Sequence, residues 1–392
     1  MMSHAEQYDF DTLVSRENTH SVKWDFIPAD KDDLLPLWIA DMDFVCAQPI
    51  IDAMRARVDR RIFGYSMPFT DEYLEAVTGW FRRRANWNIE RESIVVAPGI
   101  VPALGVLIRA LTSEGDGIII QNPVYYPFSK MIANNGRRLV NNPLINNEGV
   151  YTMDFEDLEA KARDPKVTMM LLCNPHNPVG RVWTPEELST VADICLRNNV
   201  LLISDDIHCD LIREDAVYTP VSSLNPSERI ITCTSASKTF NLAGLHLSNI
   251  VIPDEGMRKL WEAEALGRCG LFGGNAFGIV ATQAAYTHGE VWLEQVNRYI
   301  ADNLRYIGEF VADRLPKARY WYPEGTYFAW IDFREYGYSS EQLEDLMLNR
   351  ARVALDEGYI FGEEGCGFER INVACPRSIL EDCMERMAEA LG

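Results

Sequence analysis

Short apolar runs alternate with helical patterns between about residue 93 and residue 266 of this 392-residue chain. The runs lie at residues 93–96, 117–120, 168–173, 200–204, 230–233 and 248–252. Polar and apolar residues do not alternate cleanly within them, which is typical of strands buried on both faces. Helical patterns separate several runs, at residues 101–111, 185–197 and 254–266. The sequence therefore predicts an α/β fold in which helices sandwich a mostly parallel sheet.

The two ends of the chain have a different texture. Residues 1–47 look irregular, and helical patterns follow at 50–62 and 72–84. After about residue 285, a long helical pattern at 291–315 precedes predicted strands at 327–333 and 370–373 and helices at 342–352 and 379–391. We expect a large domain over residues 48–287, and a smaller α+β domain built from the N-terminal arm, 1–47, and the C-terminal segment, 288–392.

Charge and cysteine usage exclude several classes of protein. The formal net charge is -21 at pH 7 without a Lys/Arg cluster, which argues against a nucleic-acid or membrane-surface partner. The nine cysteines are scattered without a Cys-x-x-Cys pair, so neither a disulfide framework nor a thiolate metal site is expected. The N-terminus lacks signal-peptide features, and Gly, Pro or charge interrupts each apolar run. We expect a cytoplasmic enzyme.

Lys238 follows the predicted strand 230–233 in the motif Ser-Ala-Ser-Lys. A lysine at the end of a buried strand can hold an aldehyde as a Schiff base, and pyridoxal 5'-phosphate (PLP) is the commonest aldehyde cofactor. A surface lysine in a serine-rich turn is the simpler interpretation of the motif alone. The other strand ends decide between the two, because ligands of an open parallel sheet bind beyond the carboxyl ends of its strands.

Two strand ends carry acidic, imidazole and amide groups. Asp205 follows the run 200–204 and can keep a pyridine nitrogen protonated, with His208 close behind it. A helix N-cap and a core histidine are the alternative roles. Asn177, in the Asn-Pro-rich turn after 168–173, is a candidate donor to a phenolate oxygen, although the segment also suits a plain turn.

Groups suited to an anion and to a flat ring follow other strands. A glycine and a proline leave the amides of Ile100 and Val101 free at a helix start, where a phosphate can bind. Tyr125 can stack on a ring, although paired tyrosines more often pack together. Near the C-terminus, Arg370 suits a substrate carboxylate, with a structural ion pair as the alternative.

In order and spacing, these residues resemble the site of the fold-type-I PLP enzymes, the aspartate aminotransferase superfamily, over essentially the whole chain. The resemblance implies a homodimer that binds an amino acid substrate. It implies that Lys238 is the Schiff-base lysine and a catalytic residue, and that Asp205 contacts the pyridine nitrogen, Asn177 the phenolic oxygen and His208 the side of the ring. Tyr125 would stack on the ring and assist proton movements. The phosphate would be bound by Ile100, Val101, Ser235 and, from the neighbouring subunit, Tyr65, and the substrate carboxylate by Arg370.

Departures from the usual aminotransferase pattern resemble the carbon–sulfur lyase branch, the MalY-type and PatB-type cystathionine β-lyases and cystalysin. Aminotransferases of this group usually carry a phosphate-binding arginine where this chain has His246, and a tyrosine where it has His208. The segments 38–44, 205–208 and 374–377 are also similar to this branch. A protonated His246 would contribute to phosphate binding.

The branch implies β-elimination of cystathionine, cysteine or an S-substituted cysteine to a thiol, pyruvate and ammonia. An aminotransferase is the alternative, because it shares every step up to the substrate carbanion. A regulatory or binding protein on the same fold is a further alternative, which the absence of an appended basic DNA-binding segment disfavours.

Overall fold

The computed structural model describes residues 7–26 and 33–392 of the chain. The portions 1–6 and 27–32 of the expected N-terminal arm lie outside the described residues.

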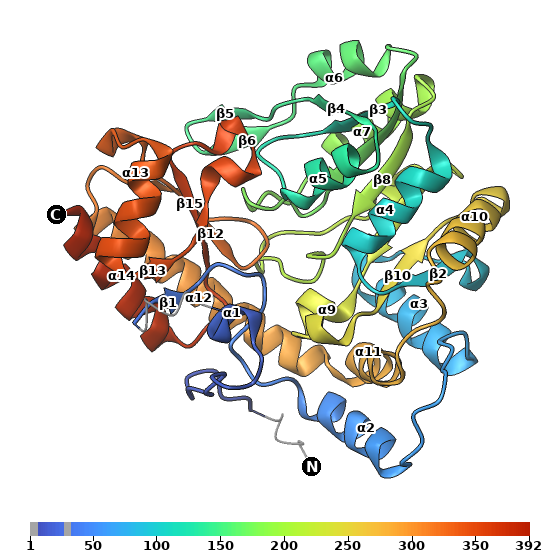
Figure 1. The fold of residues 1–392 in the computed structure, drawn as a ribbon, viewed down its shortest axis with the longest axis horizontal. Coiled ribbons are helices and arrows are strands. Elements are labelled where there is room, and N and C mark those ends of the chain that lie inside the picture. Colours follow the sequence, from blue (N-terminus) through green and yellow to red (C-terminus); the bar gives the residue numbers. More distant parts are fainter. Residues whose placement is uncertain (1–6, 27–32) are drawn as a thin grey trace.

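A sheet of seven strands forms the centre of the larger part of the molecule (Figure 1). In sheet order the strands are β2 (Ile94–Ala97), β10 (Ser248–Val251), β9 (Ile230–Thr234), β8 (Leu201–Asp205), β7 (Val167–Cys173), β3 (Gly117–Ile120) and β4 (Arg138–Asn141). Strand β10 is antiparallel to both of its neighbours, and the other adjacent pairs are parallel. The mostly parallel sheet is confirmed, and each predicted run forms one of its strands.

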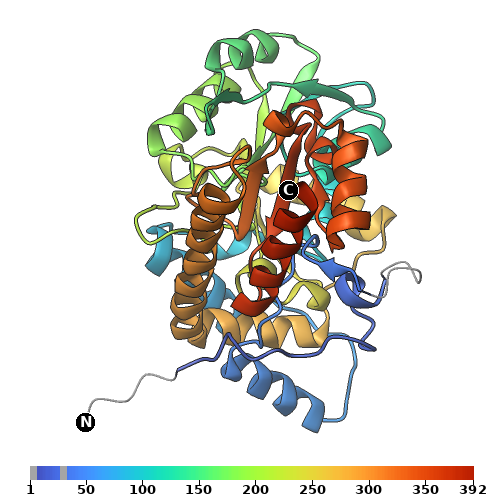
Figure 2. The same ribbon diagram turned by 90° about the vertical axis from the view of Figure 1, so that its left-hand side faces the viewer.

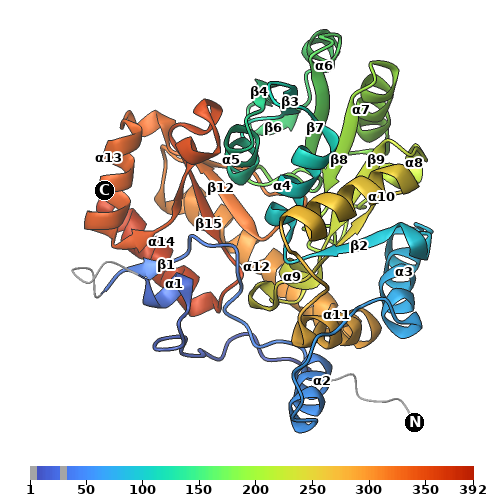
Figure 3. The same cartoon turned by 45° about the vertical axis from the view of Figure 1, so that its right-hand side comes forward.

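Helices cover both faces of this sheet. Successive strand residues point to opposite sides, so neighbouring residues pack into different hydrophobic clusters. Ile118 and Ile203 belong to one hydrophobic cluster, whereas Ile119 and Leu202 belong to another. The first cluster includes residues of α4 (Ile100–Leu111), α5 (Pro127–Asn134) and α10 (Glu255–Glu262), and the second includes residues of α6 (Phe155–Ala162), α7 (Pro185–Arg197) and α8 (Val221–Leu224). Figure 3 shows α4 and α10 in front of the sheet. Burial on both faces explains why the strands lack polar alternation.

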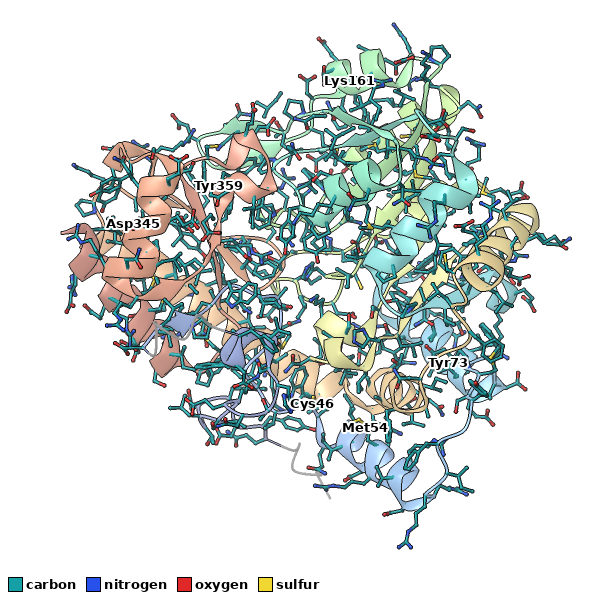
Figure 4. The ribbon with its side chains drawn as sticks, in the orientation of Figure 1. Cys46, Met54, Tyr73, Lys161, Asp345 and Tyr359 are labelled. Carbon is teal, nitrogen blue, oxygen red and sulfur yellow. The ribbon has the colours of Figure 1, made fainter. Side chains whose placement is uncertain are left out.

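Helices near the start of the chain pack beside β2 and β10. They are α2 (Gln48–Asp59) and α3 (Asp71–Ala85), which lie against α11 (Ala276–His288). Tyr73 of α3, labelled in Figure 4, donates a 2.9 Å hydrogen bond from its buried hydroxyl to Oδ1 of Asn249 in β10. This contact connects the helical layer to β10, the strand next to the edge strand β2.

A second, antiparallel sheet lies in the C-terminal part of the chain. Its order is β11 (Arg319–Tyr320), β12 (Phe328–Asp332), β15 (Phe368–Asn372) and β14 (Asp356–Glu357). It is accompanied by α12 (Glu290–Arg314), α13 (Ser340–Asp345) and α14 (Arg377–Leu391), and Figure 2 shows α12 and α14 side by side. Strand β1 (Leu35–Pro36) pairs with β13 (Val353–Ala354). The N-terminal arm is therefore in contact with the C-terminal segment.

The remaining elements are short. They include α1 (Val22–Asp25), the hairpin of β5 (Ile145–Asn147) and β6 (Val150–Thr152), α9 (Ala236–Thr239), and π-helical turns at Ala263–Arg268 and Leu346–Ala351. Single 3-10 turns lie at Arg91–Ser93, Ala243–Leu245, Arg334–Tyr336, Gly358–Phe361 and Glu363–Gly365. All nine cysteines are free thiols. Among the described residues, no helix is both long and apolar enough to cross a membrane.

Candidate active site

Most of the residues singled out at the strand ends lie around one cavity of about 340 Å³. Its walls include Ile100, Val101, Tyr125, Asn177, Asp205, His208, Lys238 and His246. These residues are far apart in the sequence, and they meet because parallel strands bring their carboxyl ends to one edge of the sheet.

Lys238 lies in the single-turn helix α9, directly after β9. Its Nζ donates a 2.5 Å hydrogen bond to the backbone oxygen of Ala40, rather than to a carboxylate. Burial lowers the pKa of the amine to about 8, and the charge of Asp41 acts in the opposite direction. With this pKa, roughly a tenth of the molecules carry the neutral amine at pH 7, and the neutral form is the one that acts as a nucleophile or base.

The N-terminal arm anchors the segment that follows this lysine. Asn241 receives a hydrogen bond from the backbone N–H of Met42 at 3.0 Å and donates from Nδ2 to the Met42 oxygen at 2.9 Å. Cys46, labelled in Figure 4, directs its thiol at the backbone oxygen of Phe240 over 3.6 Å. The arm thus holds both Ala40 and the loop after α9 in place.

Asp205 ends β8 with its carboxyl group on the cavity wall and 4 % of its surface exposed. Its Oδ1 accepts a 3.2 Å hydrogen bond from the backbone N–H of Ile207, and burial raises its pKa to about 7. A buried carboxyl group with so few donors favours a cationic or N–H-bearing ligand, which lowers the cost of ionisation.

His208 is buried beside Asp205. Its ring packs edge-on against Tyr327 and Phe328, with 5.6 Å between ring centroids in each case. Burial, aided by the charges of Lys238 and Arg370, lowers its pKa well below the usual range. Within the described residues its Nδ1 has no hydrogen-bond partner. A neutral imidazole with an orphaned nitrogen on the cavity wall indicates a polar ligand there.

Another wall of the cavity suits an anion. Ile100 and Val101 begin α4, whose N-terminus presents unpaired amides and the positive end of the helix dipole. The preceding Gly99 has a φ of +151°, a conformation that favours glycine. His246 adopts a left-handed conformation with a φ of +48° and lines the same cavity. This wall can hold a phosphate through backbone amides and an imidazole.

The two serines of the lysine motif have different positions. Ser237 lines the cavity, whereas Ser235 does not. The Ser235 hydroxyl donates to the backbone oxygen of Leu247 at 2.8 Å and accepts from the backbone N–H of Ser237 at 3.1 Å. A phosphate contact for Ser235 stays a prediction. The motif offered no reason to choose Ser237, because both serines precede the lysine in the same turn.

Arg370 is buried in β15, and it both forms an ion pair and contacts the cavity wall. Its Nη1 donates to Oδ1 of Asn177 at 2.8 Å, and its Nη2 donates to the Trp38 backbone oxygen at 3.1 Å. Nη2 also pairs with Asp356 of β14, a residue that no sequence pattern indicated. The guanidinium lies 3.9 Å from the ring centroid of Phe328. Asn177 thus connects Arg370 to the cavity, while its substrate contact stays a prediction.

Of the two tyrosines expected to contact the cofactor, Tyr125 lies on the cavity wall and Tyr65 lies on the exposed surface. Tyr125 is half-buried on the cavity wall, and burial raises its pKa. Tyr65 is 96 % exposed in the loop between α2 and α3, with its ring 5.8 Å from that of Phe272. A contact between Tyr65 and the phosphate of a neighbouring subunit stays a prediction.

Together, the groups around the cavity fit PLP. The cavity offers a lysine of lowered pKa for an aldehyde, a carboxyl group for a pyridine nitrogen, a helix N-terminus for a phosphate and a tyrosine ring for stacking.

Comparison with known proteins agrees with this donor set. The chain matches the family model of aminotransferase class I and II over residues 33–387. Cystathionine beta-lyase PatB of Bacillus subtilis (strain 168) is 42 % identical over 387 residues, which cover 98 % of this chain and 100 % of PatB.

Solved structures are equally similar. The crystal structure of cystalysin from Treponema denticola, which contains pyridoxal 5'-phosphate, has a TM-score of 0.95 at 37 % identity and covers 98 % of this chain and 99 % of that one. A PLP-bound candidate aminotransferase from Clostridium difficile 630 has a TM-score of 0.95 at 43 % identity, covering 98 % and 100 %. These matches confirm the resemblance drawn from the motifs, and the chain belongs to the aminotransferase class I and II family.

Proposed function

We propose that this protein is a PLP-dependent carbon–sulfur β-lyase that converts cystathionine, cysteine or an S-substituted cysteine to a thiol, pyruvate and ammonia. The observation that carries the proposal is the meeting of Lys238, Asp205 and Asn177 with the N-terminus of α4 on one cavity. Similarity to PatB over the full length of both chains supports the lyase reaction within the family.

In this proposal each residue around the cavity binds a different part of the cofactor. Lys238 would bind the aldehyde, Asp205 would accept a hydrogen bond from the ring N–H, and Asn177 would donate to the phenolic oxygen. His208 and Tyr125 would lie against the ring, and Ile100, Val101, His246 and the Ser235–Ser237 turn would hold the phosphate. The bound cofactor supplies a ring that delocalises the negative charge formed at the substrate α-carbon.

The chain's own residues then bind the substrate and move its protons. Arg370 holds the substrate carboxylate, because a guanidinium forms two parallel hydrogen bonds with it. Once the amino group of the substrate has taken the place of Lys238, the released lysine amine removes the proton from the α-carbon. The bond between the β-carbon and sulfur breaks, and the sulfur leaves with the electron pair and gains a proton. Overall, one thioether and one water give one thiol, one pyruvate and one ammonium ion.

Product analysis tests this function. The purified holoenzyme is incubated with cystathionine, and pyruvate and free thiol are measured with and without a 2-oxo acid. We expect equal amounts of both products without the acceptor, and none from Lys238→Ala. Amino-group transfer that strictly requires the acceptor would instead establish an aminotransferase, the reaction named for the similar Clostridium difficile protein.

We further propose that the active unit is a homodimer in which Tyr65 reaches the neighbouring site. Tyr65 contacts Phe272 and Phe63 contacts Phe277; three of these rings are exposed around the loop before α3, and Phe277 is half-buried. A patch of exposed aromatic rings favours a protein interface. Light scattering is expected to give a dimer, and Tyr65→Ala is expected to lower the affinity for PLP. A monomer that binds PLP with full affinity would contradict this arrangement.

A further inference from the structure

The backbone oxygen of Ala40 accepts hydrogen bonds from two side chains at once. One donor is Nζ of Lys238, at 2.5 Å, and the other is the hydroxyl of Tyr327, at 3.0 Å. Ala40 and Lys238 line the cavity of the candidate active site, whereas Tyr327 is fully buried directly before β12. A residue of the C-terminal part of the chain thus shares the acceptor of the active-site lysine.

The Ala40 carbonyl group is held in place from both of its neighbours in the chain. Nδ2 of Asn372 donates to the backbone oxygen of Ile39 at 2.7 Å and to that of Asp41 at 2.6 Å. These bonds fix the peptide groups on either side of Ala40. The Ala40 oxygen therefore keeps its direction when one of its own two donors is removed.

Tyr327 is fixed equally firmly. The buried Thr326 before it has a φ of +68°, a backbone conformation that a β-branched residue rarely adopts. The N–H of Thr326 donates to the Leu211 oxygen at 2.7 Å, and the N–H of Val373 donates to the Tyr327 oxygen at 3.0 Å. Backbone strain of this kind persists where the surrounding structure enforces it, and such positions cluster at functional sites.

The Tyr327 hydroxyl is a constant donor over the pH range in which Lys238 titrates, because burial raises the pKa of Tyr327 well above its ordinary value. Two donors on one carbonyl oxygen compete, since each draws electron density from the lone pairs that the other uses. An ammonium group is a stronger donor than a neutral amine, so the competition costs the ammonium form more. The hydroxyl is neutral, and its effect adds to that of the charged groups around Lys238, which are Asp41, Arg370 and Asp205.

We propose that Tyr327 is a positioning residue of the active site, whose hydroxyl shares the Ala40 oxygen with Lys238 and thereby favours the neutral amine of that lysine. This inference rests on the role of Lys238 in the proposed function and deepens it. Tyr327 acts through the backbone of the N-terminal arm and does not touch the reacting atoms.

The reactivity of Lys238 in the apoprotein tests this role apart from turnover. The apoprotein is treated with acetic anhydride at a series of pH values, and peptide mass spectrometry gives the rate constant for acetylation of Lys238. The pH midpoint of this rate reports the pKa of the amine, and its plateau reports accessibility. We expect Tyr327→Phe to move the midpoint upward by about 0.5–1 pH unit, the effect of one hydrogen bond. The fold is retained, because phenylalanine keeps the ring contacts with His208 and Phe328.

A matched control is Tyr322→Phe, since the hydroxyl of Tyr322 likewise donates to a backbone oxygen, that of Ala301, at 3.2 Å. This change should leave the midpoint of Lys238 as it is. A midpoint that stays constant or falls in Tyr327→Phe overturns the proposed role. A changed plateau at a constant midpoint also overturns it, because loosened packing alone produces that result.

Failure of this inference is distinguishable from failure of the proposed function, because the apoprotein midpoint depends neither on PLP nor on the reaction. A raised midpoint in Tyr327→Phe, combined with PLP attached to a lysine other than Lys238, would support the action of Tyr327 and overturn the proposed function. A constant midpoint, combined with PLP on Lys238 and pyruvate release, would do the reverse.

Discussion

Asp205 and Asp206 are neighbours at the end of β8, and burial raises the pKa of both to about 7. The carboxyl group of Asp206 accepts hydrogen bonds from the hydroxyls of Ser204 and Tyr218. Asp205 accepts one from the Ile207 N–H at 3.2 Å and faces the cavity. Asp206, which stabilises the fold, thus has two side-chain hydrogen-bond donors, whereas Asp205, which faces the cavity, has a single backbone donor and can accept a hydrogen bond from a ligand.

The largest expected difference between the two is catalytic. We expect Asp205→Asn to lower kcat/KM for cystathionine by about 10²–10³-fold, the range for removing one preorganised electrostatic partner. Asp206→Asn, which keeps an acceptor for the two hydroxyls, should change it less than about tenfold. Steady-state pyruvate release at saturating PLP measures both. Equal losses of kcat/KM in the two variants would contradict the assignment of Asp205 to the ligand and Asp206 to the fold.

A second difference concerns the pH dependence of stability in the apoprotein. In the unfolded chain Asp205 ionises near the ordinary aspartate pKa of 3.8, whereas in the folded chain its pKa is about 7. The folded state therefore binds more protons between these values, and the stability from the protonated carboxyl is lost as pH rises toward 7. Asparagine does not ionise, so Asp205→Asn should stabilise the apoprotein about 2–3 kcal/mol more at pH 8 than at pH 5.

Urea unfolding of the apoprotein at the two pH values measures this effect. PLP provides the control, because a cation beside Asp205 favours its ionised form and should remove the advantage of asparagine. An apoprotein variant whose gain is the same at both pH values would show that Asp205 is already charged at pH 5.

The smallest expected effect lies on the Asp206 side. Tyr218→Phe removes one of the two hydroxyls that donate to Asp206. We expect a loss of about 1–3 kcal/mol in the free energy of unfolding, because a buried acceptor is left with fewer donors. The absorbance of bound PLP should stay unchanged, since Tyr218 does not line the cavity. A shifted absorbance would mean that the two carboxyl groups act as one unit.

Local patterns predicted the strands and the polar residues that follow them, because a buried strand and the turn after it are short-range features. They did not predict Asp356, whose contact with Arg370 depends on the pairing of β14 with β15. Nor did they predict helix α11, where small buried residues such as Ala281 and Ala285 give no one-sided apolar stripe. Edge strand β4 was missed because it is short and begins with the exposed Arg138. The domain limits at 47/48 and 287/288 stay predictions.

The most direct test of the account is to identify the lysine that holds the cofactor. Borohydride reduction of the holoenzyme fixes a Schiff base permanently, and peptide mass spectrometry then locates the label. The position of Lys238, half-buried on the cavity wall with a pKa lowered to about 8, predicts the label on Lys238 alone. A stoichiometric label on any other lysine, with Lys238 unmodified, would contradict the account.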